Sequence, residues 1–115
     1  MEYKNLQEKR EKYKKLLEIS LNRIVEKLKE KVEKIILIGS YIKRKDLFTD
    51  LDIIVIMDTD KPFLDRVKEI YSLLELPVDA DILCYTPLEY LQLRQKKLFK
   101  QIEKEGIILY EKKSN

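Results

Sequence analysis

Histidine is absent from the 115 residues of this chain, and Cys84 is its only cysteine. Zinc sites built from cysteine and histidine are therefore excluded, as are Ser-His-Asp and Cys-His catalysis. One cysteine cannot form a disulfide within the chain. Any chemistry must rely on carboxylates, lysines, arginines, tyrosines or a bound metal.

Long hydrophobic runs are also missing. Residues 1–15 carry no apolar core of a signal peptide, and no run approaches the roughly 20 residues that span a membrane. We therefore expect a soluble, cytoplasmic protein with no membrane partner. Glutamine, asparagine and methionine are sparse while charged residues reach 39%, a bias typical of a thermophile.

The chain also lacks a large excess of positive or negative charge. The net charge is only +3, and lysines and glutamates are interleaved along the chain. The sequence thus predicts no extended basic face, so we expect no nucleic-acid partner.

The length predicts one domain over residues 1–115, with a single core. Residues 1–31 contain no proline or glycine, and their apolar residues recur at helical spacing, which predicts a long amphipathic helix. At 1.5 Å per residue this helix would be about 45 Å long, more than so small a domain can cover. Two interpretations stay open: a solvated charged face, or an arm for a homo- or hetero-oligomer.

The rest of the chain alternates strands with helices. Strands are expected at residues 32–38, 51–57, 78–85 and 107–110. A short helix or turn is expected at residues 40–44, and longer helices are expected from Pro62 and from Pro87 to Glu105. This order predicts an α/β (α+β) domain with its core at about residues 32–110, in which helices flank a small sheet.

Local signals mark both ends of the last helix. Thr86, Pro87 and Glu89 have the spacing of a capping box with proline in the first turn. Gly106 is expected to end the helix as a left-handed cap.

Paired carboxylates open two of the predicted strands. Side chains alternate along a strand, so Asp50 and Asp52 should project to one side and hold one or two Mg²⁺ ions. Asp79 and Asp81 repeat the pattern on the next strand. If that strand is a neighbour, about 4.8 Å away, a third carboxylate joins the site. We favour Asp81, because its strand is otherwise apolar, and keep Asp79 as the substitute.

A candidate phosphate-binding segment precedes the first carboxylate pair. Gly39 lets the backbone approach a ligand closely, and Ser40 adds a hydroxyl donor. The basic residues that follow, Lys43, Arg44 and Lys45, either meet phosphate charge or form a solvated connection.

Gly39-Ser40, nine residues, and then Asp50-Leu51-Asp52-Ile53 form a recognisable spacing. It resembles the Gly-Ser…Asp-x-Asp signature of the polymerase-beta-like nucleotidyltransferase superfamily, above all its small stand-alone members, the minimal nucleotidyltransferases (MNT). The resemblance spans about residues 35–110. Many members carry Ala-Arg-Gly after the Gly-Ser-aromatic, where this chain has residues 42–45, Ile-Lys-Arg-Lys. The resemblance implies the nucleotidyltransferase fold, a small mixed sheet flanked by helices.

The resemblance also implies roles for individual residues. Asp50, Asp52 and Asp81 would be the catalytic triad and would bind two Mg²⁺ ions. Nucleotide-binding residues would be Gly39, Ser40 and Arg44. The reaction would transfer a nucleoside monophosphate, most often AMP from ATP, to a hydroxyl. Many minimal members are encoded beside a HEPN partner and act as antitoxin of a toxin–antitoxin pair.

Two functions follow as hypotheses. The first is an Mg²⁺-dependent nucleotidyltransferase acting on a HEPN-type partner. The alternative is a non-catalytic nucleotide-binding module that neutralises its partner by contact. An aspartyl-phosphate phosphatase is disfavoured, because its Asp-x-Asp ends a strand, whereas here the apolar run follows the motif. Nucleotide addition to RNA is disfavoured by the lack of a basic patch.

Overall fold

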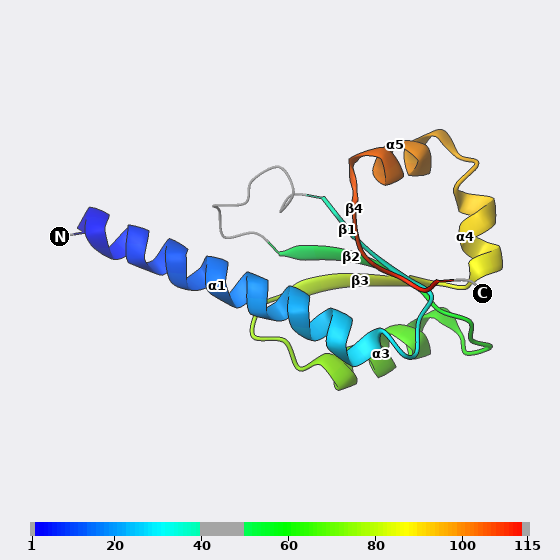
Figure 1. The fold of residues 1–115 in the computed structure, drawn as a ribbon, viewed down its shortest axis with the longest axis horizontal. Helices are drawn as coiled ribbons and strands as arrows, with labels where there is room; N and C mark the ends of the chain where they lie inside the picture. The colour runs from blue at the N-terminus through cyan, green and yellow to red at the C-terminus, as the bar shows by residue number, and fades with distance from the viewer. Residues whose placement is uncertain (1, 40–49, 114–115) are drawn as a thin grey trace.

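A computed structural model describes residues 2–39 and 50–113, which form a four-stranded sheet with helices on both faces (Figure 1). The elements in chain order are α1 (Glu2–Leu28), β1 (Lys34–Ile38), β2 (Leu51–Ile56), α3 (Phe63–Leu74), β3 (Ala80–Tyr85), α4 (Pro87–Leu93), α5 (Lys97–Glu105) and β4 (Ile107–Glu111). The predicted α/β class is therefore confirmed. The turn or short helix expected at residues 40–44 lies outside the described residues.

The sheet is mixed, as predicted, with the strand order β3-β2-β1-β4. β1 lies antiparallel to both β2 and β4, whereas β2 and β3 are parallel and joined through α3. Most boundaries differ from the prediction by one to three residues. The first and third strands begin two residues later than expected, and α1 ends at Leu28 instead of residue 31.

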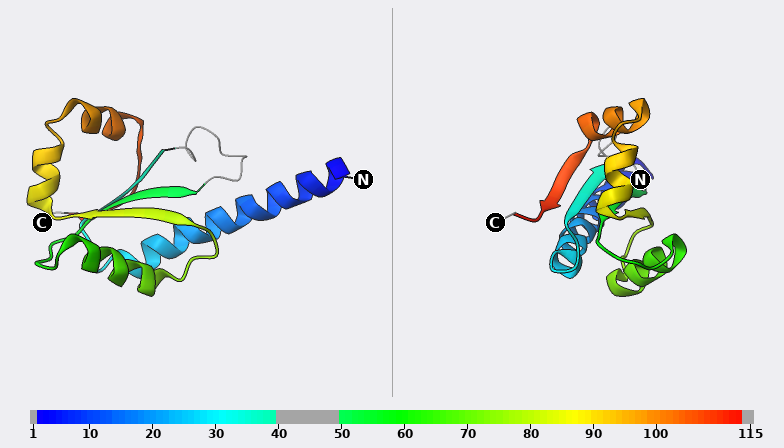
Figure 2. Two further views of the ribbon diagram at one scale, coloured as in Figure 1. Left: turned by 180° about the vertical axis from the view of Figure 1, so that it is seen from behind. Right: turned by 90° about the vertical axis from the view of Figure 1, so that its right-hand side faces the viewer.

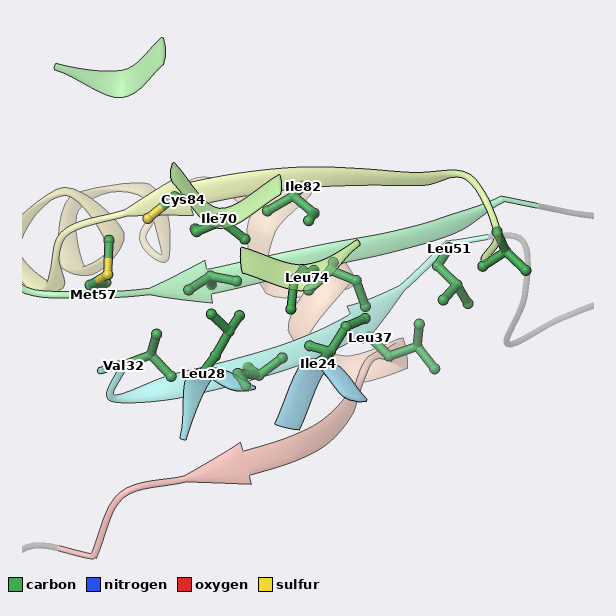
Figure 3. Packing of buried hydrophobic residues seen from close by; sticks show 14 of the residues in the cluster. Ile24, Leu28, Val32, Leu37, Leu51, Met57, Ile70, Leu74, Ile82 and Cys84 are labelled. Atoms are coloured by element: carbon green, nitrogen blue, oxygen red, sulfur yellow. The ribbon is translucent and has the colours of Figure 1, made fainter. Parts of the chain in front are cut away.

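β2 is buried on both faces, which explains why its sequence shows no alternation. Leu51 and the two alternate residues after it pack beneath α1 and α3, in the cluster that contains Ile24, Leu74 and Ile82 (Figure 3). Ile54 and the alternate residue Ile56 face the other way, into a smaller cluster. Tyr90 of α4 belongs to that second cluster. The sheet is thus the middle of three layers.

The helix α1 covers the sheet with only part of its length. Leu17, Ile24 and Leu28 are buried, whereas Leu6 is 42% exposed. The N-terminal half of α1 runs past the end of the sheet (Figures 1 and 2), and the longest dimension of the molecule is 53 Å. The helix is therefore longer than its own domain covers, as its sequence predicts. Nowhere in residues 2–39 and 50–113 does a helix combine the length and the apolar character needed to cross a membrane.

The single helix predicted from Pro87 to Glu105 was wrong, because the chain turns after Leu93 and forms two helices instead. α4 and α5 run in different directions (Figures 1 and 2). The turn lets Phe99 and Ile102 of α5 pack on the cluster that also holds Tyr90 of α4. A straight helix would carry these two apolar side chains away from the sheet. The spacing of residues in the sequence does not predict the turn after Leu93, because the turn depends on tertiary packing of α5 against the sheet.

Two expectations about helix ends also need correction. Gly106 does end α5, but it is not left-handed: its φ is −74° and its ψ is 161°. Glycine is needed there for space, since an added Cβ would lie 3.0 Å from the Ile102 carbonyl oxygen and 3.0 Å from Ile36 Cγ2. Pro62 is the N-cap of α3 and not its first residue, so the helix begins at Phe63.

The capping box at the start of α4 is present and joins a buried arginine that the sequence did not reveal. Thr86 Oγ1 accepts from the Glu89 N–H, and Glu89 Oε1 accepts from the Thr86 N–H. Arg66 of α3 is 7% exposed, and its Nη1 lies 2.7 Å from Glu89 Oε1. Its guanidinium also donates to the carbonyl oxygens of Lys61 and Cys84. This arginine ties α3, β3 and α4 together.

We predict that Arg66→Ala lowers the free energy of unfolding by about 2 kcal/mol at pH 7, because buried carbonyl groups lose their donors. Urea unfolding measures this value. Lys68→Ala, an exposed site on the same helix, should stay within about 0.5 kcal/mol of the unchanged protein.

The difference in unfolding free energy between Arg66→Ala and the unchanged protein should become smaller at acidic pH. Hydrogen bonding to Arg66, followed by the Thr86 backbone, lowers the pKa of Glu89. A carboxyl whose pKa is lowered by folding adds stability above its unfolded pKa, about 4.3, and loses it as the pH falls through the folded value. An Arg66→Ala deficit that stays constant down to pH 2 would contradict this assignment.

Candidate active site

Asp52 and Asp81 lie side by side on the two parallel strands. In the β2–β3 register Asp52 is the direct partner of Asp81, so their side chains share one face of the sheet. Asp52 is half-buried and Asp81 is exposed. On its other side Asp52 pairs with Ile38, the last residue of β1. The neighbouring strands on which the third-carboxylate prediction depended are therefore present.

Gly39 lies directly against the Asp52 carboxylate. Its φ is +82°, a left-handed conformation that glycine adopts without steric cost. A Cβ at this position would lie 2.2 Å from Asp52 Oδ2, well inside contact distance. The sequence predicted that Gly39 lets a ligand approach the backbone. In the structure the Asp52 carboxylate lies against this backbone, and the role of Gly39 in nucleotide binding stays a prediction.

Asp50 and Asp79 each lie one residue before a strand, at the edge of a cavity. The Leu51 N–H donates to the Asp79 carbonyl oxygen at 3.2 Å, which joins the starts of β2 and β3. The cavity has a volume of about 480 Å³, and Asp50, Asp79 and Asp81 line it together with Tyr71 and apolar side chains at the end of α3 and after it. Three of the four predicted carboxylates therefore border one hollow.

Tyr13 of α1 belongs to the environment of these acids, which its place in a helical pattern did not predict. Burial raises its pKa first, and the negative charges of Asp50 and Asp79 raise that pKa further. Tyr13 packs on the core cluster beneath α1. The negative charge of Asp50 therefore acts on a residue of α1. Asp52 lies on the face of the sheet that also carries Ile54 and Ile56. Asp50 lies one residue before β2, outside its regular alternation, and its projection to the same side as Asp52 stays a prediction.

The remaining predicted nucleotide-binding residues, Ser40 and Arg44, lie outside the described residues, as do Lys43 and Lys45. Their assignments stay predictions. Tyr71 is a further residue that sequence reasoning missed, because its spacing on α3 marks only a helical face. Its hydroxyl bonds to the backbone on both sides of Asp81.

The carboxylates at the starts of β2 and β3 are the candidate ligands for Mg²⁺. Within the described ranges, no group of three or more histidine, cysteine, aspartate or glutamate side chains is arranged to hold a metal ion. Asp52 and Asp81 nevertheless supply oxygen atoms from adjacent strands, the ligand type that Mg²⁺ prefers, and Mg²⁺ usually completes its shell with water and substrate phosphate. The pair therefore fits one hard cation, and Asp50 as a ligand stays a prediction.

We predict that Gly39→Ala destabilises the protein through two separable effects. A left-handed alanine costs about 1–2 kcal/mol, and the new Cβ must displace the Asp52 carboxylate. Urea unfolding should therefore show a smaller cost of Gly39→Ala in an Asp52→Ala background, where only the backbone effect remains.

Gly106→Ala serves as the control, because its φ is negative and its new Cβ would meet atoms of Ile102, Ile36 and Ile38 but none of Asp52. Its cost should be the same in both backgrounds. Equal costs of Gly39→Ala with and without the Asp52 carboxylate would show that the two residues do not press on each other.

Comparisons with known proteins identify the family of this chain. The family model described as "Polymerase beta, Nucleotidyltransferase" matches residues 20–115. No curated protein matches the chain. A crystal structure described as the toxin–antitoxin MntA-HpeT, in a mutant form, is similar in fold with a TM-score of 0.50 and 21% identity, covering 81% of this chain and 74% of that one. The family model covers both aspartates and most of the domain, and the chain belongs to the polymerase beta nucleotidyltransferase family.

Proposed function

We propose that this protein is an Mg²⁺-dependent nucleotidyltransferase that moves AMP from ATP to a hydroxyl group on a HEPN-type partner, as the antitoxin of a toxin–antitoxin pair. The observation that carries the proposal is the pairing of Asp52 with Asp81, with Gly39 against the Asp52 carboxylate. Family membership supports the transfer of a nucleotide. The partner rests on the family resemblance and on the fold shared with MntA-HpeT, described as a toxin–antitoxin assembly.

The proposed reaction is a substitution at the α-phosphorus of ATP. The acceptor hydroxyl oxygen forms a bond to that phosphorus, the bond from phosphorus to the bridging oxygen breaks, and pyrophosphate leaves. Asp81, the more exposed of the paired aspartates, acts as the general base that accepts the proton of the acceptor hydroxyl. Mg²⁺ held by Asp52 and Asp81 would supply positive charge beside the triphosphate.

The positions of Asp52 and Asp81 suit the different roles that this reaction assigns to them. Asp52 is half-buried between β1 and β3, so its carboxylate is held in one position next to the backbone at Gly39. Asp81 lies on the outer strand of the described sheet and is exposed, so it is open to an incoming acceptor. The donor side of the reaction is therefore interior, and the acceptor side faces outward toward a partner.

We predict that Asp52→Asn reduces transfer at least about a hundredfold, because a metal-binding charge is worth several kcal/mol in the transition state. The measurement is incorporation of label from α-³²P-ATP into a HEPN-type partner in the presence of Mg²⁺. Labelling of the partner by the unchanged protein is the required positive result.

Asp58→Asn is the matched control, since Asp58 is exposed just beyond the opposite end of the same strand. It should label the partner at the normal rate. Full activity of the Asp52→Asn protein would overturn the assignment of the site, and no labelling by the unchanged protein would overturn the proposed reaction.

Neutralisation of the partner by contact is the second candidate function. The observation that favours it is the exposed apolar side chains of α1: Leu6, in the projecting N-terminal half, is 42% exposed, and Ile19, in the C-terminal half, is 48% exposed. Apolar side chains at such positions suit an interface better than a solvated face. In this case the carboxylates would serve nucleotide binding alone.

The two candidates differ in which variant still neutralises the partner. If transfer is the means, we predict that Asp52→Asn binds the partner but no longer neutralises it, in a growth-rescue assay with both proteins expressed. The double variant Leu6→Ser, Ile19→Ser should weaken partner binding while leaving the fold intact, because both side chains are already exposed. Full neutralisation by Asp52→Asn, together with its loss in the double variant, would establish contact as the means.

A further inference from the structure

The outer edge of β3 is covered by side chains of α3. The backbone carbonyls of Asp79 and Tyr85 accept from Leu51 and Met57, so odd-numbered residues of this strand turn toward β2. The even-numbered residues therefore turn their backbone groups to the outer edge, where no further strand of residues 2–39 or 50–113 follows. Unpaired groups at an edge are free to fray or to pair with another chain.

Tyr71 occupies this edge beside Asp81. Its hydroxyl donates to the Ala80 carbonyl oxygen at 2.5 Å and accepts from the Ile82 N–H at 3.1 Å. In a parallel sheet these are the two groups that one residue of a further strand would bond. A tyrosine hydroxyl can do the same because it is both donor and acceptor. Arg66 continues the cover farther along, where its Nη1 donates to the Cys84 carbonyl oxygen at 3.3 Å.

We propose that Tyr71 is a positioning residue for Asp81: by bonding the backbone on both sides of it, the Tyr71 hydroxyl fixes this carboxylate beside Asp52. β2 holds Asp81 on the inner side through the parallel ladder, and Tyr71 holds it on the outer side. Its effect on catalysis rests on the proposed function, whereas its effect on the order of Asp81 does not.

Tyr71 is itself well placed for this task. It lies in the last turn of α3, and the Arg23 guanidinium of α1 donates to the carbonyl oxygen of Glu75, the residue that caps this helix, at 2.7 Å. Tyr71 is 41% exposed, so replacing it by phenylalanine removes two hydrogen bonds and little packing. That variant should fold, and it isolates the hydroxyl.

The test compares Tyr71→Phe with Tyr110→Phe, which removes a hydroxyl from the opposite edge strand, β4. Amide hydrogen exchange by NMR should show Ile82 exchanging about tenfold faster in Tyr71→Phe, because its N–H has lost its acceptor. The ¹⁵N order parameter of the Asp81 amide should fall in the same variant. Neither value should change in Tyr110→Phe.

Transfer kinetics provide the second part of the test. Tyr71→Phe should lower kcat roughly tenfold, because the displaced carboxylate no longer meets the reacting atoms well, with KM for ATP within about twofold of normal. A change in global stability alone would not separate kcat from KM in this way. Tyr110→Phe should leave both constants unchanged.

The outcomes separate the two proposals. Unchanged exchange at Ile82, or an Asp81 amide as ordered as before, would overturn the role of Tyr71 whether or not the protein is active. A normal kcat in a variant with a disordered Asp81 would overturn its catalytic consequence. If the unchanged protein transfers no nucleotide, the proposed function fails, and the order of Asp81 decides the positioning role alone.

Discussion

The parallel pairing of β2 with β3 is the constraint on which the rest of the site depends. It places Asp52 directly beside Asp81, although 28 residues separate them in the chain. A parallel pair needs a long crossover connection, and α3 supplies it. The same crossover covers one face of the sheet with Ile70 and Leu74. The fold and the candidate site are therefore products of one connection, and neither could change independently of the other.

Around this pair, the structure uses backbone contacts to place charges. Gly39 leaves room for the Asp52 carboxylate because it has no side chain, and Tyr71 bonds the backbone on both sides of Asp81. Arg66 joins the far end of the same strand to α4 through Glu89. Rigid placement of this kind matters for transfer chemistry, since misplacement by about 1 Å can cost a hundredfold in rate. Each aspartate is thus placed by contacts with groups other than the carboxylates.

How far the sequence predicted this arrangement depended on the range of each signal. Asp52 at the start of a buried strand, and the capping box at Thr86 and Glu89, follow from local patterns, and the structure contains both. The adjacency of the strand bearing Asp81 was a condition that only topology could settle. The turn after Leu93, the extended backbone of Gly106 and the covered edge at Tyr71 all arise from contacts between distant elements. The spacing of residues along the chain does not predict contacts between distant elements, so only the structure could reveal these features.

The covered edge of β3 also hinders the addition of a further strand on that side of the sheet. A strand from another molecule could pair with β3 only by displacing Tyr71 and Arg66 from the backbone groups that they bond. At the other edge, β4 presents Ile107 and Ile108, which are 41% and 54% exposed. A strand that paired with β4 instead would lie two strands away from Asp52. The molecule can acquire a neighbour there without that neighbour closing the approach to its aspartates.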